Sequence, residues 1–93
     1  MDFEWDLKKE VENIRKDGVS FSEAAECFND PFGFSMRDEK HSSKEERHYW
    51  IGKSGSERVL TVRYTRRGSA VRIFGAAEWR EFRELYYAKT KNK

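Results

Sequence analysis

Three arginines lie in three consecutive strand-like segments of the C-terminal half. Arg47, Arg63 and Arg72 fall in residues 46–52, 58–65 and 70–76, and the spacers between these segments contain glycine and are short enough for hairpin loops. Closing both loops pairs Arg47 with Arg63 and Arg63 with Arg72 on one face of an antiparallel meander. Like charges opposite one another destabilise a sheet by up to about 1 kcal/mol per pair. A bound anion that neutralises the three arginines would offset this repulsion. Because the planar guanidinium group binds phosphate through two parallel hydrogen bonds, the row predicts a phosphate-binding face.

Two alternatives remain open for this arginine row. Each arginine could pair with an acidic residue of the N-terminal half, or the register could differ, since a slip of one residue sends a side chain to the opposite face. The halves do differ in charge. Residues 1–45 hold 7 Lys/Arg and 12 Asp/Glu, whereas residues 46–93 hold 12 and 5. This asymmetry indicates either an anionic partner for the second half or attraction between the halves.

Aromatic and basic side chains surround the proposed row. Tyr49 and Phe74 share its face, where they could stack on the bases of single-stranded RNA or pack under a helix. Arg80, Arg83 and Tyr87 lie on one flank of the predicted last helix and could extend the basic surface or form a solvated helix face. The opposite sheet face is mostly apolar, with His48, Trp50, Leu60, Val62, Tyr64, Val71 and Ile73.

The residues that commonly bind metals or cofactors are sparse. His41 and His48 have no second histidine or cysteine at ligand spacing, and no phosphate-binding glycine loop or hydrolase motif is present. We therefore expect no metal and no cofactor. Cys27 is the single cysteine and is expected to be a small buried apolar residue. With no possible internal disulfide, and no apolar run near the ~20 residues of a membrane helix, a cytoplasmic protein without membrane contact is expected.

The N-terminal half must supply the elements that hold this meander. Residues 3–5 alternate as in a strand, Asp6 is a good N-cap, and an apolar stripe of Leu7, Val11 and Ile14 indicates an amphipathic helix that ends at Gly18.

A second helix and a loop complete this half. Ser20 and Glu23 have the spacing of a capping box before a short helix that Asp30-Pro31 ends. Residues 31–45 are the least regular part of the sequence, and residues 38–44 look like a polar surface loop or a hairpin tip. After the meander, Trp79, Phe82 and Tyr86 indicate a helix from about Glu78. The sequence predicts one α+β domain over residues 1–93: a strand, two helices, an antiparallel three-strand meander and a C-terminal helix.

Several segments together resemble the BrnT family, the toxin components of a bacterial type II toxin–antitoxin system. The segments are Phe3-Glu4-Trp5-Asp6, Lys16-Asp17-Gly18-Val19-Ser20-Phe21-Ser22-Glu23-Ala24-Ala25, Phe28-Asn29-Asp30-Pro31, Glu46-Arg47 with Ile51-Gly52, and Val71-Arg72-Ile73. They span nearly the whole chain in the right order. The resemblance implies a small RelE-like fold, metal-independent RNA cleavage and growth arrest. It also implies a ribbon-helix-helix antitoxin encoded nearby, which would neutralise the toxin and link it to operator DNA.

A metal-free ribonuclease needs positive charge on the developing phosphorane and groups that move protons. We assign the charge to Arg47, Arg63 and Arg72, with Arg67 and Arg80 at the rim. Glu78 and Lys16 are the candidate bases, and Lys16 is also a candidate RNA contact.

The chain departs from the family pattern at two places. It has Asp17 where the family commonly has a histidine, and Ala77 where the family commonly has an arginine. A member that binds RNA or antitoxin without cleaving is therefore one alternative function. A module whose basic surface receives an acidic peptide is another.

Overall fold

The predicted order of elements is present in the computed structural model, which describes residues 1–91. The elements are β1 (Asp2–Trp5), α1 (Leu7–Asp17), α2 (Phe21–Glu26), the 3-10 turn η1 (Cys27–Asn29), β2 (Phe34–Arg37), the 3-10 turn η2 (Glu39–His41), β3 (Arg47–Lys53), β4 (Val59–Arg67), β5 (Ala70–Ala77) and α3 (Arg80–Thr90). The strand, the two helices, the meander and the last helix are confirmed, and so is the α+β class.

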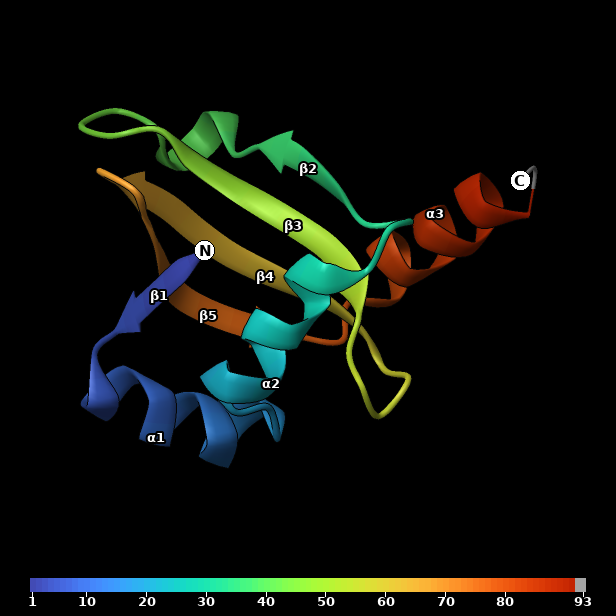
Figure 1. Ribbon diagram of the computed structural model, residues 1–93, viewed down its shortest axis with the longest axis horizontal. Helices are drawn as coiled ribbons and strands as arrows, with labels where there is room; N and C mark the ends of the chain where they lie inside the picture. The colour runs from blue at the N-terminus through green and yellow to red at the C-terminus, as the bar shows by residue number, and fades with distance from the viewer. Residues whose placement is uncertain (92–93) are drawn as a thin grey trace.

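All five strands form one sheet in the order β1-β5-β4-β3-β2 (Figure 1). β1 runs parallel to β5, with Phe3 beside Val71, and the other neighbours are antiparallel. The prediction that residues 31–45 are irregular is wrong for Phe34–Arg37, which form the edge strand β2. Three of its four residues are exposed, so the sequence carries no apolar alternation to mark it.

The sequence-predicted caps hold the first two helices. Asp6 accepts hydrogen bonds from the backbone N–H groups of Lys8 and Lys9, and Gly18 ends α1 in the left-handed conformation at φ 69°. The Ser20 hydroxyl accepts from the backbone N–H of Glu23 at 3.1 Å. The Glu23 carboxylate is directed away from this cap, to Arg58.

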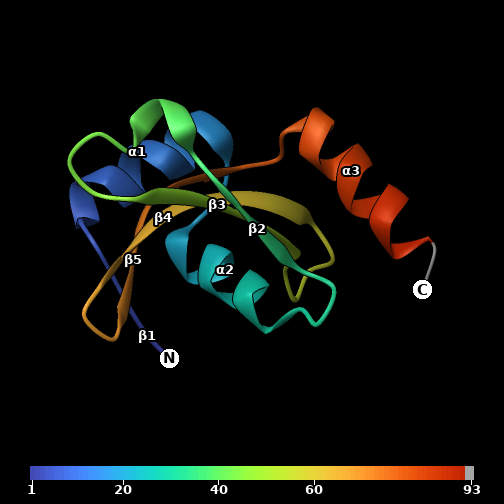
Figure 2. The same cartoon turned by 90° about the horizontal axis from the view of Figure 1, so that it is seen from above.

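The apolar face of the sheet is covered by α2 and η1, which lie on one side of it, while α1 and α3 lie toward the other (Figure 2). Phe28 of η1 stacks on Trp50 at 5.1 Å between ring centroids and meets Tyr64 edge-on at 5.2 Å. The predicted apolar residues of this face join the main core cluster, apart from His48, which is partly buried beside Tyr64. The core residues are Val19, Phe21, Ala24, Cys27, Leu60, Val62, Tyr64, Val71, Ile73 and Ala76.

The second face is covered at one end by α3. Tyr86 packs with Ile51 and Val59, and its hydroxyl donates to the Asp30 carboxylate at 2.6 Å. Burial raises the pKa of Tyr86, and the bond to Asp30 adds to the shift. The helix starts at Arg80, two residues after the predicted Glu78.

At the other end of this face, α1 is attached to β5 by polar contacts. The Asn13 amide donates to the carbonyl oxygens of Val19 and Ala76, both at 2.8 Å, and accepts from the Ala76 N–H. The apolar stripe of α1 therefore stays on the solvent side, where Leu7 is 71% exposed, Val11 56% and Ile14 48%.

Candidate functional site

The three arginines of the predicted row share a face but do not lie side by side. Arg47 is paired with Thr65, Thr65 with Arg72, and Arg63 with Tyr49. The predicted pairs Arg47–Arg63 and Arg63–Arg72 are therefore wrong.

The loop lengths explain this difference in register. Lys53 still belongs to β3, and the hairpin at Gly68-Ser69 is two residues long, so both pairings shift by two residues. An even shift keeps each side chain on its predicted face.

A β-bulge in the β4–β5 pairing, between Arg63 and Tyr64, places Arg63 opposite Gly75. Tyr64 pairs with Ile73 and Arg63 with Gly75, so Phe74 is the additional residue on β5. The Arg63 guanidinium covers Gly75, where a Cβ atom would come within 2.1 Å of Arg63 Nη2. Arg47 lies over the Phe74 ring at 4.4 Å from the centroid, a cation–π contact. Phe74 thus has the Arg47 guanidinium over its ring, with Lys9 also 5.5 Å from the ring centroid, while the Arg63 guanidinium lies at the neighbouring Gly75.

Two hollows meet at this point, and both are lined by Arg47, Arg63 and Phe74. The first lies against α1 and adds Lys9, Glu12, Asn13, Lys16 and Asp17. The second lies against η2 and the start of α3, and adds Asp38, His41, His48, Tyr49 and Trp79. The predicted Lys16 and Tyr49 therefore join Arg47 and Arg63 at the site.

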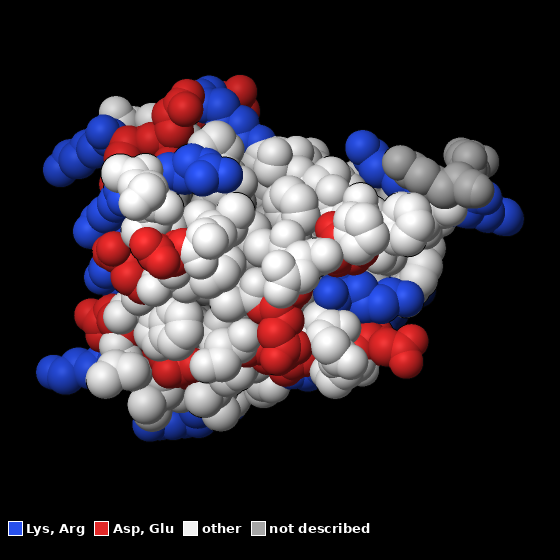
Figure 3. All heavy atoms as spheres, in the orientation of Figure 1, with Lys and Arg blue, Asp and Glu red and all other residues white. Residues whose placement is uncertain are grey.

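The cations of this site have few anionic partners. Among residues 1–91, no carboxylate lies at ion-pair distance from Arg63. Arg47 shares the single carboxylate of Glu45 with Arg67, at 3.7 and 3.8 Å. The face that α2 covers differs: Lys and Arg lie mainly at its rim, and acidic and uncharged groups fill its middle (Figure 3). Arg63 is therefore the uncompensated arginine of the site, and Arg47 is compensated in part by the carboxylate that it shares with Arg67.

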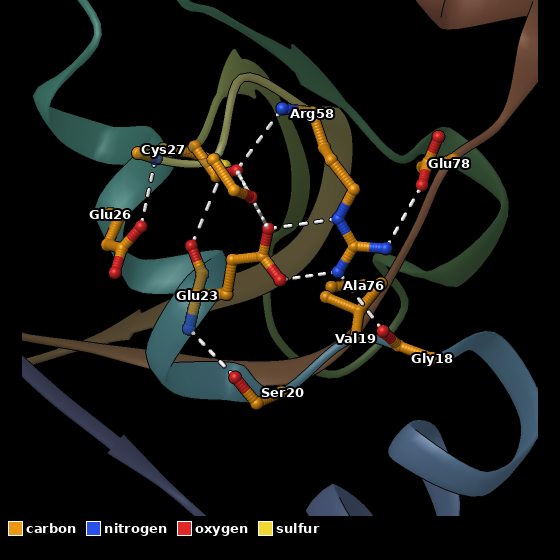
Figure 4. A network of polar contacts seen from close by, with 12 residues as sticks. Gly18, Val19, Ser20, Glu23, Glu26, Cys27, Arg58, Ala76 and Glu78 are labelled. Carbon is orange, nitrogen blue, oxygen red and sulfur yellow. Dashed lines mark hydrogen bonds and ion pairs between the residues drawn. The ribbon is translucent and has the colours of Figure 1, made fainter.

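Arg58 is the counter-example, because four of its five N–H donors are bonded within the fold (Figure 4). Its Nε and Nη2 donate to the two carboxylate oxygens of Glu23, its Nη1 donates to Glu78 at 3.1 Å, and Nη2 also donates to the Gly18 carbonyl. The hydrogen bonds from Arg58 lower the pKa of Glu23 to about 2, with help from Ser56 and Ser54 and against the effect of burial. This Arg58 cluster ties α2, the β3–β4 loop and the start of α3 together.

The remaining predicted residues lie around the site. The Glu78 carboxylate belongs to the Arg58 cluster and also lies 4.0 Å from Arg83; it lines neither hollow. Arg72 donates to Glu4 of the neighbouring strand at 2.9 Å and also lines neither hollow. Arg67 lies at the far end of β4 with Glu45. Arg80, Arg83 and Tyr87 are exposed on α3.

The Tyr49 ring packs against other aromatic rings of the protein and is not free on both faces to stack on RNA bases. Its ring contacts those of Trp79 at 5.7 Å and Phe82 at 5.5 Å. Burial raises the pKa of Tyr49, and the charge of Asp38 and a hydrogen bond to it act in the same direction. Trp79 remains 38% exposed beside the second hollow.

Sequence reasoning considered His41 only as a metal ligand and did not find its contact with Asp38. Asp38 is 6% exposed and caps η2, and its Oδ2 lies 2.9 Å from His41 Nδ1. The Asp-x-x-His spacing at a turn is the one signal that could have indicated this pair.

Three further observations limit the chemistry of the described residues. Burial raises the pKa of the Cys27 thiol to about 12, and nearby carboxylates add to the shift, so this thiol is unreactive. Within residues 1–91, no three His, Cys, Asp or Glu side chains are grouped to hold a metal ion. No helix in this range is long and apolar enough to cross a bilayer.

The fold and the site together describe a small α+β protein in which arginines from β3 and β4 line two hollows on one sheet face. A family model described as "Ribonuclease toxin, BrnT, of type II toxin-antitoxin system" matches residues 5–81. The chain therefore belongs to the BrnT family of ribonuclease toxins, and the resemblance seen in its sequence is confirmed.

A solved structure supports the same fold. The crystal structure of the Brucella abortus ribonuclease toxin BrnT is similar with a TM-score of 0.65 at 21% identity, covering 85% of this chain and 96% of that chain. No curated protein sequence matches the chain.

Proposed function

We propose that this protein cleaves RNA at the face where Arg47 and Arg63 meet, by attack of a 2′-hydroxyl on the adjacent phosphate and without a metal ion. The observation that carries the proposal is that Arg47 and Arg63 line the same two hollows beside Phe74, and that no carboxylate lies at ion-pair distance from Arg63 among residues 1–91. Arg63 can therefore receive a phosphate without first breaking an internal salt bridge, and Arg47 has to give up only a 3.7 Å contact with Glu45 that it shares with Arg67.

The reaction makes two demands that this face can meet. Charge accumulates on the non-bridging oxygens as the pentavalent phosphorane forms, and preorganised donors that stabilise it contribute about 10²–10³-fold each in rate. Arg47 and Arg63 supply those donors. The cation–π contact with Phe74 holds the Arg47 guanidinium in place before substrate arrives.

Other cations are placed to bind the flanking phosphates. Lys9 and Lys16 of α1 line the first hollow, and Arg67 lies beyond Arg47 at the rim. Arg80, Arg83 and Tyr87 offer a second approach along α3. Arg72, bonded to Glu4, makes the smallest contribution in this proposal.

The toxin class implies an antitoxin partner. We further propose a ribbon-helix-helix antitoxin encoded nearby, contact with operator DNA only through that antitoxin, and a cytoplasmic location.

One observation favours a non-cleaving member as the second candidate. Asp17, at the position where the family commonly has a histidine, lines the first hollow next to Lys16. A carboxylate there weakens phosphate binding and supplies no imidazole.

A direct assay decides between the two. Purified protein is incubated with single-stranded RNA in EDTA, and the products are compared with those from RNA carrying 2′-deoxy substitutions. We expect cleavage that leaves 2′,3′-cyclic phosphate ends and that fails at 2′-deoxy positions. The double variant R47A/R63A should lose activity by about 10³-fold or more.

The matched control is R66A, which removes an exposed arginine of the same strand on the opposite sheet face. It should cleave at the wild-type rate. RNA that stays intact but bound would overturn the nuclease proposal in favour of the binder.

A further inference from the structure

The proposed reaction needs a group that removes the proton of the 2′-hydroxyl, and neither Glu78, Lys16 nor the arginines supply it. Glu78 is held by Arg58, a lysine ammonium such as that of Lys16 has no lone pair to accept a proton, and arginine stays protonated at any working pH. We propose, resting on the nuclease function above, that His41 is this general base and that Asp38 is its positioning residue.

The geometry of η2 orients the imidazole. Asp38 accepts hydrogen bonds from the backbone N–H of His41 at 3.3 Å and, through Oδ2, from Nδ1 at 2.9 Å. His41 is the only basic side chain at ion-pair distance from Asp38 among residues 1–91. A carboxylate can only accept, so the proton of the neutral ring lies on Nδ1 and Nε2 keeps its lone pair.

Hydrogen bonds connect the η2 turn to Arg47, one of the two arginines proposed to bind the phosphate. The backbone N–H of Asp38 donates to the Arg47 carbonyl at 2.8 Å, and the Arg47 N–H donates to the Ser42 hydroxyl at 3.0 Å. That hydroxyl donates in turn to the Asp38 carbonyl at 2.6 Å. Hydrogen bonds on both sides of His41 therefore fix the turn against the first residue of β3.

His41 also has the access that a base requires. Its side chain is 54% exposed, whereas that of Asp38 is only 7% exposed. The imidazole lines the second hollow with Arg47 and Arg63, and it also lines the neighbouring hollow that Arg67 closes. A phosphate held by the two arginines would thus have an imidazole at its edge.

The step balances without any further cofactor. Nε2 takes the proton of the 2′-hydroxyl as O2′ bonds to phosphorus, and the P–O5′ bond breaks with its electron pair leaving on O5′. O5′ takes a proton from water, and the imidazolium returns its proton to solvent. The Asp38 carboxylate stabilises the imidazolium while it lasts.

The test measures single-turnover cleavage and binding separately. The variants are H41A and D38N, with E39Q as control, because Glu39 lies in the same turn, pairs with Arg37 and lines neither hollow of the site. We expect H41A to lower the cleavage rate by about 10²–10⁴-fold and D38N by up to about 10⁴-fold, because an amide in place of the carboxylate favours the wrong tautomer of the imidazole. Binding of a 2′-deoxy analogue should be unchanged in all three variants, and imidazole should restore part of the H41A rate.

A substrate with a 5′-bridging sulfur separates base from acid. Its thiolate leaving group needs no proton, so loss of a base persists on it whereas loss of an acid disappears. Wild-type-like cleavage by H41A, no rescue by imidazole, or loss of the defect on the sulfur substrate each overturns the assignment of His41 while leaving the nuclease function standing. If the wild-type protein does not cleave, both proposals fall.

Discussion

Arg58 and Arg63 lie on the same strand-rich half of the chain, five residues apart, and their surroundings are opposite. Arg58 donates to Glu23, Glu78 and the Gly18 carbonyl, which uses four of its five N–H donors inside the fold. Arg63 lies over Gly75 with no carboxylate at ion-pair distance among residues 1–91. The comparison shows that acidic neighbours, not the arginine itself, decide whether the cation serves the fold or a ligand.

The contrast between paired and unpaired arginines also explains the charge difference between the acidic first half and the basic second half of the chain. Carboxylates from the first half pair with Arg58, Arg72 and Arg47, through Glu23, Glu4 and Glu45 respectively. Attraction between the halves is therefore real for some arginines. What remains for an anionic partner is the uncompensated charge around Arg63 and the helix cations next to it.

The largest predicted effect is the loss of RNA cleavage when Arg63 is replaced, and it tests the contrast between Arg63 and Arg58 directly. Replacing Arg63 by alanine should lower RNA cleavage by about 10²–10³-fold, because one donor to the phosphorane is lost. Thermal unfolding should be unchanged, since no internal partner is left unpaired. A large fall in melting temperature for R63A would show that Arg63 is a structural residue like Arg58.

Arg58 should show the reverse pattern. R58A should lower the free energy of unfolding by about 2–3 kcal/mol at pH 7, because Glu23 loses its charged hydrogen-bond donor. Cleavage by the folded fraction should be unchanged.

The pH dependence of this loss follows from Glu23. Its folded-state pKa is lowered from 4.5 to about 2, so its stabilisation is complete above pH 4.5 and is lost as the pH falls toward 2. The gap in unfolding free energy between wild type and R58A should therefore narrow over that window in chemical denaturation. A gap that stays constant would mean that Arg58 acts through packing alone.

Arg72 should give the smallest effect of the three. Its guanidinium is bonded to Glu4 and stands two strands from Arg47, across Thr65. We expect R72A to change cleavage by less than about threefold and stability by less than about 1 kcal/mol, as for other exposed ion pairs. An R72A protein that is folded but inactive would restore the row of three arginines as the catalytic unit.

Much of this fold follows from local sequence signals. Asp6 and Ser20 mark helix starts through their side-chain oxygens, and Gly18 marks a helix end through its left-handed conformation. Alternation along the meander assigns each side chain up to the bulge at Phe74 to its correct face. β2 could not be found this way, because an exposed edge strand needs no apolar pattern.

The site was partly predictable for the same reason. A shift of two residues changes which residues pair but leaves each side chain on the same face of the sheet. The prediction that Arg47, Arg63 and Phe74 share one face is therefore correct, although their predicted neighbours are not. Which arginine lies next to which depends on the lengths of the two hairpin loops and on the bulge at Arg63, and the alternation pattern of the sequence specifies neither. The sequence does not predict the Asp38–His41 contact, because it lies in an irregular turn. The proposed role of this pair also depends on the hydrogen bonds that hold the turn against Arg47, and these are visible only in the structure.

Gly75 has a consequence for how toxin function can be lost in a population of cells. Every missense change at this codon adds a Cβ atom, and the atoms it meets are the mobile end of Arg63, not backbone. Such alleles are expected to displace Arg63 while leaving the sheet intact. Among cells that survive expression of the toxin without its antitoxin, missense mutations at the Gly75 codon should therefore recur. The protein that they encode should be full-length and folded but inactive.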